Sequence, residues 1–279
     1  MSYHKILSAL LCEEWQVRPS WQSQAIQAVK VHLEGGGSPP FAAPKQDRSE
    51  ESKCGVTFSG DYALLKVEGV IGRHLSLLEM VCSEGYDLAR LEKQIEEIEA
   101  REHITTVILW FNSPGGRATW VHEAATLVRN LAESRRVIAW IDSECCSAAY
   151  YIAAGCTAIY GPETAVVGSI STIIALIDDS ERWKKEGLKL ELFTDGTLKA
   201  AGIRGASLTD AQRKFFETRR DECGARFKMF VIECRPQIER EALEGGWYSC
   251  ATGKVLGLVD DCIPTMQALI ERLESERAD

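Results

Sequence analysis

The segment ITTVILWF, residues 104–111, constrains the fold more than any other part of the chain because it is almost continuously apolar. A strand with one face in water alternates apolar and polar residues, whereas an unbroken apolar run is typical of a parallel strand covered on both faces. Residues 88–100 before it and 122–133 after it space their apolar residues as amphipathic helices do. The sequence therefore predicts an α/β fold with helices packed on a parallel sheet.

The same alternation continues along the chain and predicts right-handed βαβ units. Four more strands are expected, at 61–72, 136–142, 157–161 and 165–171. Three more helices are expected, at 147–155, 208–233 and 265–277. These elements lie within residues 56–279, which we expect to form one domain with a sizeable core.

The first 55 residues have a different character. Residues 1–34 show helical periodicity in two pieces separated by Arg18, Pro19 and Ser20, which predicts an N-terminal helical arm. Residues 35–55 are rich in polar residues, glycine and proline and cannot bury enough apolar surface to fold alone. We expect them to form a flexible linker between the arm and the domain.

Composition excludes several classes of protein. The formal net charge of -9 argues against nucleic-acid binding, since phosphate contacts need a basic surface. No run approaches the roughly 18 apolar residues of a membrane span, and no secretory cleavage site follows the start, so a cytoplasmic location is expected. The ten cysteines lack paired metal-ligand spacing, which indicates reduced thiols, and we expect no metal and no cofactor.

Residues suited to chemistry lie at strand-to-helix junctions, where α/β folds place their sites. In the turn SPGG at 113–116, Pro114 fixes one backbone angle, while Gly115 and Gly116 permit a close approach of the main chain. Such a turn can aim N–H groups at a bound carbonyl, although the pattern alone favours an ordinary tight turn. The same ambiguity applies to Ser147, which begins a helix and could simply be its N-cap.

Three further residues widen the choice of chemistry. The N–H of Ala148, beside the Ser147 hydroxyl at a positive helix end, could stabilise an oxyanion formed when that serine attacks. Lys199 follows a predicted strand at 190–193 and a glycine turn, and a lysine acts as a base only where burial disfavours its charged form. His122, which opens the helix after SPGG, is the alternative base and ranks below Lys199.

Taken in order, these motifs resemble the signal peptide peptidase A (protease IV) family of Ser–Lys serine proteases. The resemblance covers residues 62–263 and rests on NSPGG, SAAYYIA, VGSIS, the Gly-x-x-Lys turn and the closing GLVD. It implies a ClpP/crotonase-like fold for 56–279, with Ser147 as nucleophile and Lys199 as general base. The further roles it implies are Ser169 as the residue that orients the lysine, and the N–H groups of Ala148 and of Gly115 or Gly116 as the oxyanion hole.

The resemblance also implies partners. Substrates of this family lie extended and add a strand beside the site, and its members form ring-like homo-oligomers. With no membrane span expected, the chain most resembles the soluble branch of tailed bacteriophages, which matures the capsid by cleaving a scaffold protein and itself. Within a procapsid in the host cytoplasm, the linker at 35–55 would be the self-cleavage region.

Three other interpretations stay open at this point. The chain could be a host peptidase of the same family that acts on signal peptides or on proteins to be degraded. It could be a non-hydrolytic crotonase-like enzyme that binds a CoA thioester at the SPGG turn, although that chemistry needs neither the serine nor the lysine. It could also be an inert structural relative.

Overall fold

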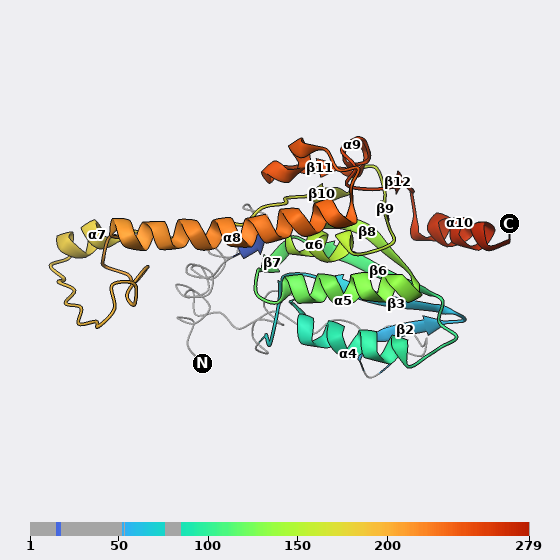
Figure 1. Ribbon diagram of the computed structural model, residues 1–279, viewed down its shortest axis with the longest axis horizontal. Helices are drawn as coiled ribbons and strands as arrows, with labels where there is room; N and C mark the ends of the chain where they lie inside the picture. The colour runs from blue at the N-terminus through green and yellow to red at the C-terminus, as the bar shows by residue number, and fades with distance from the viewer. Residues whose placement is uncertain (1–14, 18–51, 53, 76–84, 279) are drawn as a thin grey trace.

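The computed structural model of the protein describes residues 15–17, 52, 54–75 and 85–278. A central sheet of eight strands runs through the main body, with the order β11-β10-β8-β6-β3-β2 (Figure 1). Strand β9 also pairs with β8, and β12 pairs with β9. Strands β3, β6, β8 and β10 run parallel, and β9 runs parallel to β8. The strand bounds are β2 Val56–Ser59, β3 Tyr62–Glu68, β6 Thr106–Ser113, β8 Arg136–Cys146, β9 Ala158–Gly161, β10 Val166–Gly168, β11 Trp247–Ser249 and β12 Asp261–Cys262.

Helices connect the parallel strands. The connections are made by α4 (Leu88–Glu99) between β3 and β6, α5 (Val121–Ser134) between β6 and β8, and α6 (Ala148–Ala154) between β8 and β9. The long helix α8 (Asp210–Cys234) begins with a capping box in which Thr209 and Gln212 bond to each other's main chain. The predicted α/β class built of repeated βαβ units is confirmed by this topology.

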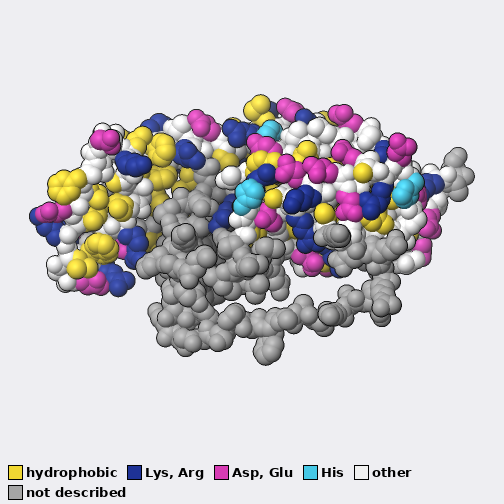
Figure 2. Space-filling view, turned by 90° about the horizontal axis from the view of Figure 1, so that it is seen from below, with side chains coloured by type: hydrophobic (Ala, Val, Ile, Leu, Met, Phe, Trp, Pro, Cys, Tyr) yellow, Lys and Arg dark blue, Asp and Glu magenta, His cyan; other side chains and the backbone are white. Residues whose placement is uncertain are grey.

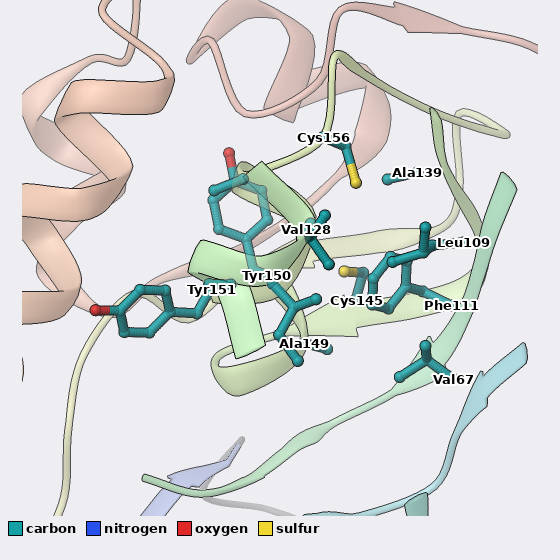
Figure 3. Packing of buried hydrophobic residues seen from close by; sticks show 14 of the residues in the cluster. Val67, Leu109, Phe111, Val128, Ala139, Cys145, Ala149, Tyr150, Tyr151 and Cys156 are labelled. Atoms are coloured by element: carbon teal, nitrogen blue, oxygen red, sulfur yellow. The ribbon is translucent and has the colours of Figure 1, made fainter. Parts of the chain in front are cut away.

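The apolar run of β6 is buried on both faces, as its composition predicts. Its odd-numbered residues Val107, Leu109 and Phe111 belong to the large core beneath the helices. Figure 3 shows Leu109 and Phe111 beside Cys145, close to α6. Ile108 points to the opposite face and joins a second cluster that α10 (Met266–Ala278) covers.

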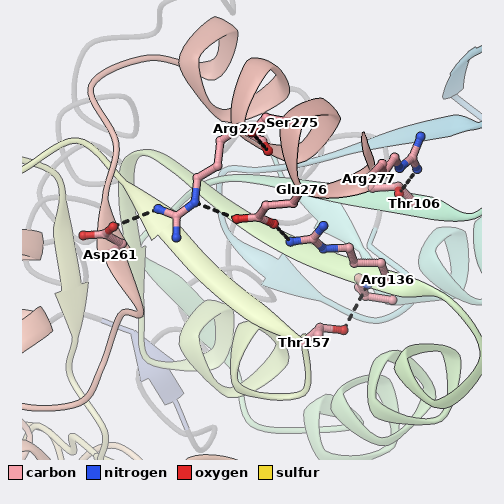
Figure 4. A network of polar contacts seen from close by, with 9 residues as sticks. Thr106, Arg136, Thr157, Asp261, Arg272, Ser275, Glu276 and Arg277 are labelled. Carbon is pink, nitrogen blue, oxygen red and sulfur yellow. Dashed lines mark hydrogen bonds and ion pairs between the residues drawn. The ribbon is translucent and has the colours of Figure 1, made fainter. Parts of the chain in front are cut away.

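Charged side chains fasten α10 to this second face (Figure 4). Arg272 donates to Asp261 at 2.8 Å and to Glu276 at 2.9 Å. Arg136 at the start of β8 also bonds Glu276, and Arg277 pairs with Asp61 at 2.7 Å. The C-terminal helix is therefore held by several linked ion pairs as well as by apolar contacts.

A second, smaller sheet lies beside the first and has the order β1-β7-β4-β5. Its strands are β1 Trp15–Val17, β4 Ile71–Gly72, β5 Tyr86–Asp87 and β7 Gly115–Arg117. The prediction of an N-terminal helical arm is wrong at residues 15–17, because their main chain pairs antiparallel with β7 instead of closing helical turns. The rest of 1–34 lies outside the described residues.

The predicted linker meets the domain at its last residues. Arg90 Nε and Gln94 Nε2 of α4 each donate to the carbonyl of Cys54 at 2.9 Å. Strand β2 then begins at Val56, where the domain is expected to begin. The greater part of 35–55, including the proposed self-cleavage region, lies outside the described residues.

Residues 177–209, here called the projecting segment, extend away from the sheet together with the first half of α8 (Figure 1). The segment contains the short helix α7 (Ser180–Lys185), but the strand predicted at 190–193 does not form, and no strand among the described residues pairs with it. Phe193 is 91% exposed there. Figure 2 shows apolar side chains gathered at this end, and the exposed ones are Ile177, Leu188, Leu192, Phe193, Leu198 and Ile203.

One carboxylate fixes the projecting segment. Asp179 accepts hydrogen bonds from Arg204 at 2.7 Å and from the N–H of Gly205 at 2.7 Å, and these bonds hold the pKa of Asp179 below its usual range. The two ends of the segment are thereby tied together. None of the helices in the described part of the chain combines the length and apolar composition that a membrane span needs.

Candidate active site

The carboxyl ends of three neighbouring parallel strands meet at Ser147. Ser113 at the end of β6 pairs with Cys145 of β8, and Gly168 at the end of β10 pairs with Cys146. The N–H of Ser147 donates to the carbonyl of Gly168 at 2.8 Å. Since adjacent strands lie roughly 5 Å apart, the register puts the SPGG turn on one side of Ser147 and Gly168 on the other.

The backbone of Ser147 is strained at the junction of β8 and α6. Its φ of 55° and ψ of -116° lie outside the regions that residues with a side chain prefer. Its side chain makes no capping hydrogen bond, so the interpretation of Ser147 as an ordinary N-cap is wrong. A strained serine between a strand and a helix is the geometry of a nucleophile elbow, in which the hydroxyl is presented for attack.

The hydroxyl of Ser147 is buried without a partner. The residue is 1% exposed, and its Oγ has no hydrogen-bond partner among the described residues. Leaving a buried hydroxyl unpaired costs about 1–3 kcal/mol. Ala148 is the first residue of α6, and N–H groups of a first helical turn have no acceptor within the helix. A reacting group beside Ser147 would therefore find a free hydroxyl and free donors together.

The SPGG turn needs both of its glycines. Gly115 has a φ of 104°, which residues with a side chain rarely adopt. A side chain at Gly116 would place its Cβ 1.9 Å from the carbonyl oxygen of Ile71, because β4 passes directly beside it. Ser113, to which the sequence analysis gave no role, fixes the turn by donating to Gly69 O at 2.6 Å and accepting from Gly115 N at 3.2 Å. The sequence signal that could have indicated this role is the position of Ser113 within the motif NSPGG.

A second strained serine follows on the other side. Ser169 has a φ of 57° and is 5% exposed, and its N–H donates to the carbonyl of Gly246 at 2.6 Å. Gly168 before it has a φ of 115°, and a Cβ there would lie 2.8 Å from the same carbonyl. Ser147 and Ser169 therefore lie on adjacent turns, which are joined by the hydrogen bond from Ser147 N–H to the carbonyl of Gly168.

Lys199 is not brought into hydrogen-bond contact with Ser147. It lies on an exposed turn of the projecting segment, where its N–H bonds to Gly196 O at 3.1 Å. The neighbouring Leu198 is exposed as well and does not cover the lysine. The burial that a lysine base needs is therefore absent from the single chain.

The alternative base His122 is engaged elsewhere. Its Nδ1 lies 2.9 Å from the hydroxyl of Tyr151, and its ring packs edge-on against Phe230 of α8. Tyr151 also donates to the carbonyl of Arg226 at 3.2 Å. His122 thus joins three helices to one another and makes no hydrogen bond with Ser147.

The cysteines beside the site are poor nucleophiles. Burial raises the pKa of the Cys145 thiol well above its usual range, and burial also raises that of Cys250 to about 12. Both thiols therefore stay protonated near neutral pH. Within the described ranges no cluster of side chains is arranged to hold a metal ion.

Comparison with protein families gives a match to the family described as peptidase family S49, over residues 129–278. The match covers more than half of the chain. The chain belongs to peptidase family S49. The residues that match include Ser147, Ser169 and Lys199, whereas the SPGG turn lies before them.

Curated members and relatives of family S49 are distant in sequence. The protease MJ0651 of Methanocaldococcus jannaschii is 26% identical over 183 residues, which are 64% of this chain and 58% of that protein. The capsid assembly protease C of Escherichia phage lambda is 23% identical over 231 residues, which are 81% of this chain and 50% of that protein. The chain spans about half the length of the curated relatives it matches.

Solved structures include similar folds of two kinds. ClpP1 of Listeria monocytogenes has a TM-score of 0.45 at 13% identity, covering 74% of this chain and 94% of its own. An enoyl-CoA hydratase/isomerase family member has a TM-score of 0.42 at 14% identity, covering 80% and 74%.

Proposed function

We propose that this member of family S49 is a serine endopeptidase in which Ser147 attacks the peptide carbonyl. The observation that carries the proposal is the Ser147 hydroxyl, which is buried, unpartnered and held on a strained elbow between two glycine turns. An unpaired buried hydroxyl and a strained backbone both cost stability, so a purely structural role does not explain them. Chemistry at that hydroxyl does.

The proposed reaction proceeds through an acyl-enzyme. Lys199 Nζ, as a neutral amine, takes the proton of Ser147 while Oγ forms a bond to the carbonyl carbon. The oxyanion is held by the N–H of Ala148 and by that of Gly115 or Gly116. The C–N bond then breaks, the lysine returns the proton to the leaving amine, and water releases the acyl group by the same steps. Ser169 is the proposed positioning residue for the lysine.

Lys199 must come to Ser147 from elsewhere for this mechanism to operate. We propose that it comes from the projecting segment of a second copy in a homo-oligomer. The segment supports this because its exposed apolar side chains, with Phe193 foremost, suit burial against another protein surface. A cavity of about 350 Å³ between the segment and α8 adds a concave surface of mixed character, lined by apolar residues such as Leu176 and Phe216 and by charged residues such as Arg213. Movement of the segment within one chain is the alternative.

The proposed biological setting is phage capsid maturation, in which a scaffold protein and the protease itself are cleaved in the host cytoplasm. The similarity to the capsid assembly protease of phage lambda supports this setting. A host peptidase of family S49 is the second candidate, favoured by the similarity to the archaeal protease. Cleavage of a purified scaffold protein from the same genome separates the two.

A serine-reactive fluorophosphonate tests the nucleophile and the base. Intact-mass spectrometry should show one adduct, on Ser147, which Ser147→Ala and Lys199→Ala both abolish. Ser143→Ala and Lys189→Ala are matched controls, because Ser143 lies on β8, the strand that leads to Ser147, and Lys189 lies in the same projecting segment as Lys199. Labelling that survives in Lys199→Ala at the wild-type rate would contradict the role of the lysine.

A further inference from the structure

Strand β1 covers the edge of β7 that would otherwise be free. In the small sheet, β7 has β4 on one side and β1 on the other. The register pairs Trp15 with Arg117, Gln16 with Gly116 and Val17 with Gly115. Residues 15–17 are separated from β7 by about a hundred residues in sequence. They pair with its edge in the same way as an extended peptide from another molecule adds to a sheet.

The position of β1 relative to Ser147 follows from the strand registers. Ser113, two residues before Gly115, pairs with Cys145, two residues before Ser147. Gly115 is therefore the end of β7 that lies beside the nucleophile. Since β1 runs antiparallel to β7, it advances from Trp15 toward Val17 in the direction of Ser147.

The edge of β7 lies beside Ser147 and is the kind of edge to which an extended peptide can add. Strand addition uses main-chain hydrogen bonds that any sequence provides, and a sheet edge can pair with one strand at a time. We propose that Trp15–Val17 is an internal ligand of the substrate-binding edge, so that the N-terminal segment competes with substrate for β7. This inference rests on the proposed peptidase function and adds that the chain restrains its own site.

The restraint should appear as a change in apparent affinity for substrate. A competing strand raises the KM and leaves kcat unchanged, because saturating substrate displaces it. A three-residue strand forms only a few hydrogen bonds of modest net strength, which corresponds to about a 5- to 30-fold effect on KM.

A backbone change in the full-length chain tests the inference. N–H groups of successive strand residues point to opposite sides, so Gln16→Pro combined with Val17→Pro removes whichever donor faces β7. Gln16→Ala combined with Val17→Ala is the matched control, because it shortens the same side chains and keeps both donors. The proline pair should speed amide hydrogen exchange at residues 115–117 and lower KM for a peptide by about 5- to 30-fold, with kcat unchanged. The alanine pair should behave as wild type.

The readouts separate this inference from the function on which it rests. Unchanged exchange at 115–117 in the proline variant, or faster exchange with an unchanged KM, would overturn the inference and leave the peptidase in place. Cleavage of the wild-type chain within or directly after residues 15–17 would also overturn it, because the strand would then be a substrate. Absence of both fluorophosphonate labelling and peptide hydrolysis in all three proteins would overturn the two proposals together.

Discussion

The hydroxyl of Ser147, which has no partner among the described residues, predicts that removing this proposed nucleophile stabilises the fold. A buried hydroxyl without a partner costs about 1–3 kcal/mol, and alanine removes it while keeping the same strained backbone. The cavity left by the missing oxygen atom destabilises the variant by only about 0.3 kcal/mol, which offsets a small part of that gain. Ser147→Ala should therefore raise the free energy of unfolding by about 1–2 kcal/mol, or about 2–4 °C in melting temperature for a chain of this size.

The measurement should be made in a Lys199→Ala background, so that no lysine from a second copy can satisfy the hydroxyl. Guanidinium unfolding followed by circular dichroism gives the free energies. Ser113→Ala is the matched comparison, since Ser113 is equally buried but bonds Gly69 O and Gly115 N, and its loss should destabilise by about 1–2 kcal/mol. The reasoning is refuted if Ser147→Ala also lowers the free energy of unfolding in that background.

Two further predictions concern assembly and pH. If Lys199 acts across a subunit boundary, mixing Ser147→Ala with Lys199→Ala after dissociation should restore about a quarter of wild-type peptide hydrolysis, whereas action within one chain predicts none. Hydrogen bonds from Lys254 and Arg272 lower the pKa of Asp261 to about 2, so its carboxylate contributes stability above its unfolded pKa near 3.8. That contribution should fade as the pH falls from about 4 toward 2, and Asp261→Asn should flatten the dependence, as unfolding at a series of pH values would show.

Local patterns were sufficient for the elements that form the main body. The apolar run of β6 and the helical spacing of α5 predicted both elements, because each buries the face that its own sequence marks. The order of the strand-to-helix junctions then brought Ser147 between two glycine turns, as the motifs suggested. These features depend on residues close in sequence.

Features that depend on distant partners could not be predicted in the same way. Residues 15–17 were predicted to be helical, because their own sequence contains no information about their pairing with the edge of β7. Residues 190–193 have the composition of a strand and lack a neighbour to pair with. The exposure of Lys199 could not be predicted for the same reason. Whether a lysine and its apolar neighbours are buried depends on another surface that covers them.

Main-chain hydrogen bonds connect Ser147 to the molecular surface. Ser147 N–H holds Gly168 O, and Ser169 N–H holds Gly246 O, immediately before the exposed Trp247. Main-chain hydrogen bonds transmit displacement with little slack, because neither partner has a rotamer to adjust. The exposed start of β11 is therefore connected to the strained angle at Ser147 through two main-chain hydrogen bonds, with no side chain between them.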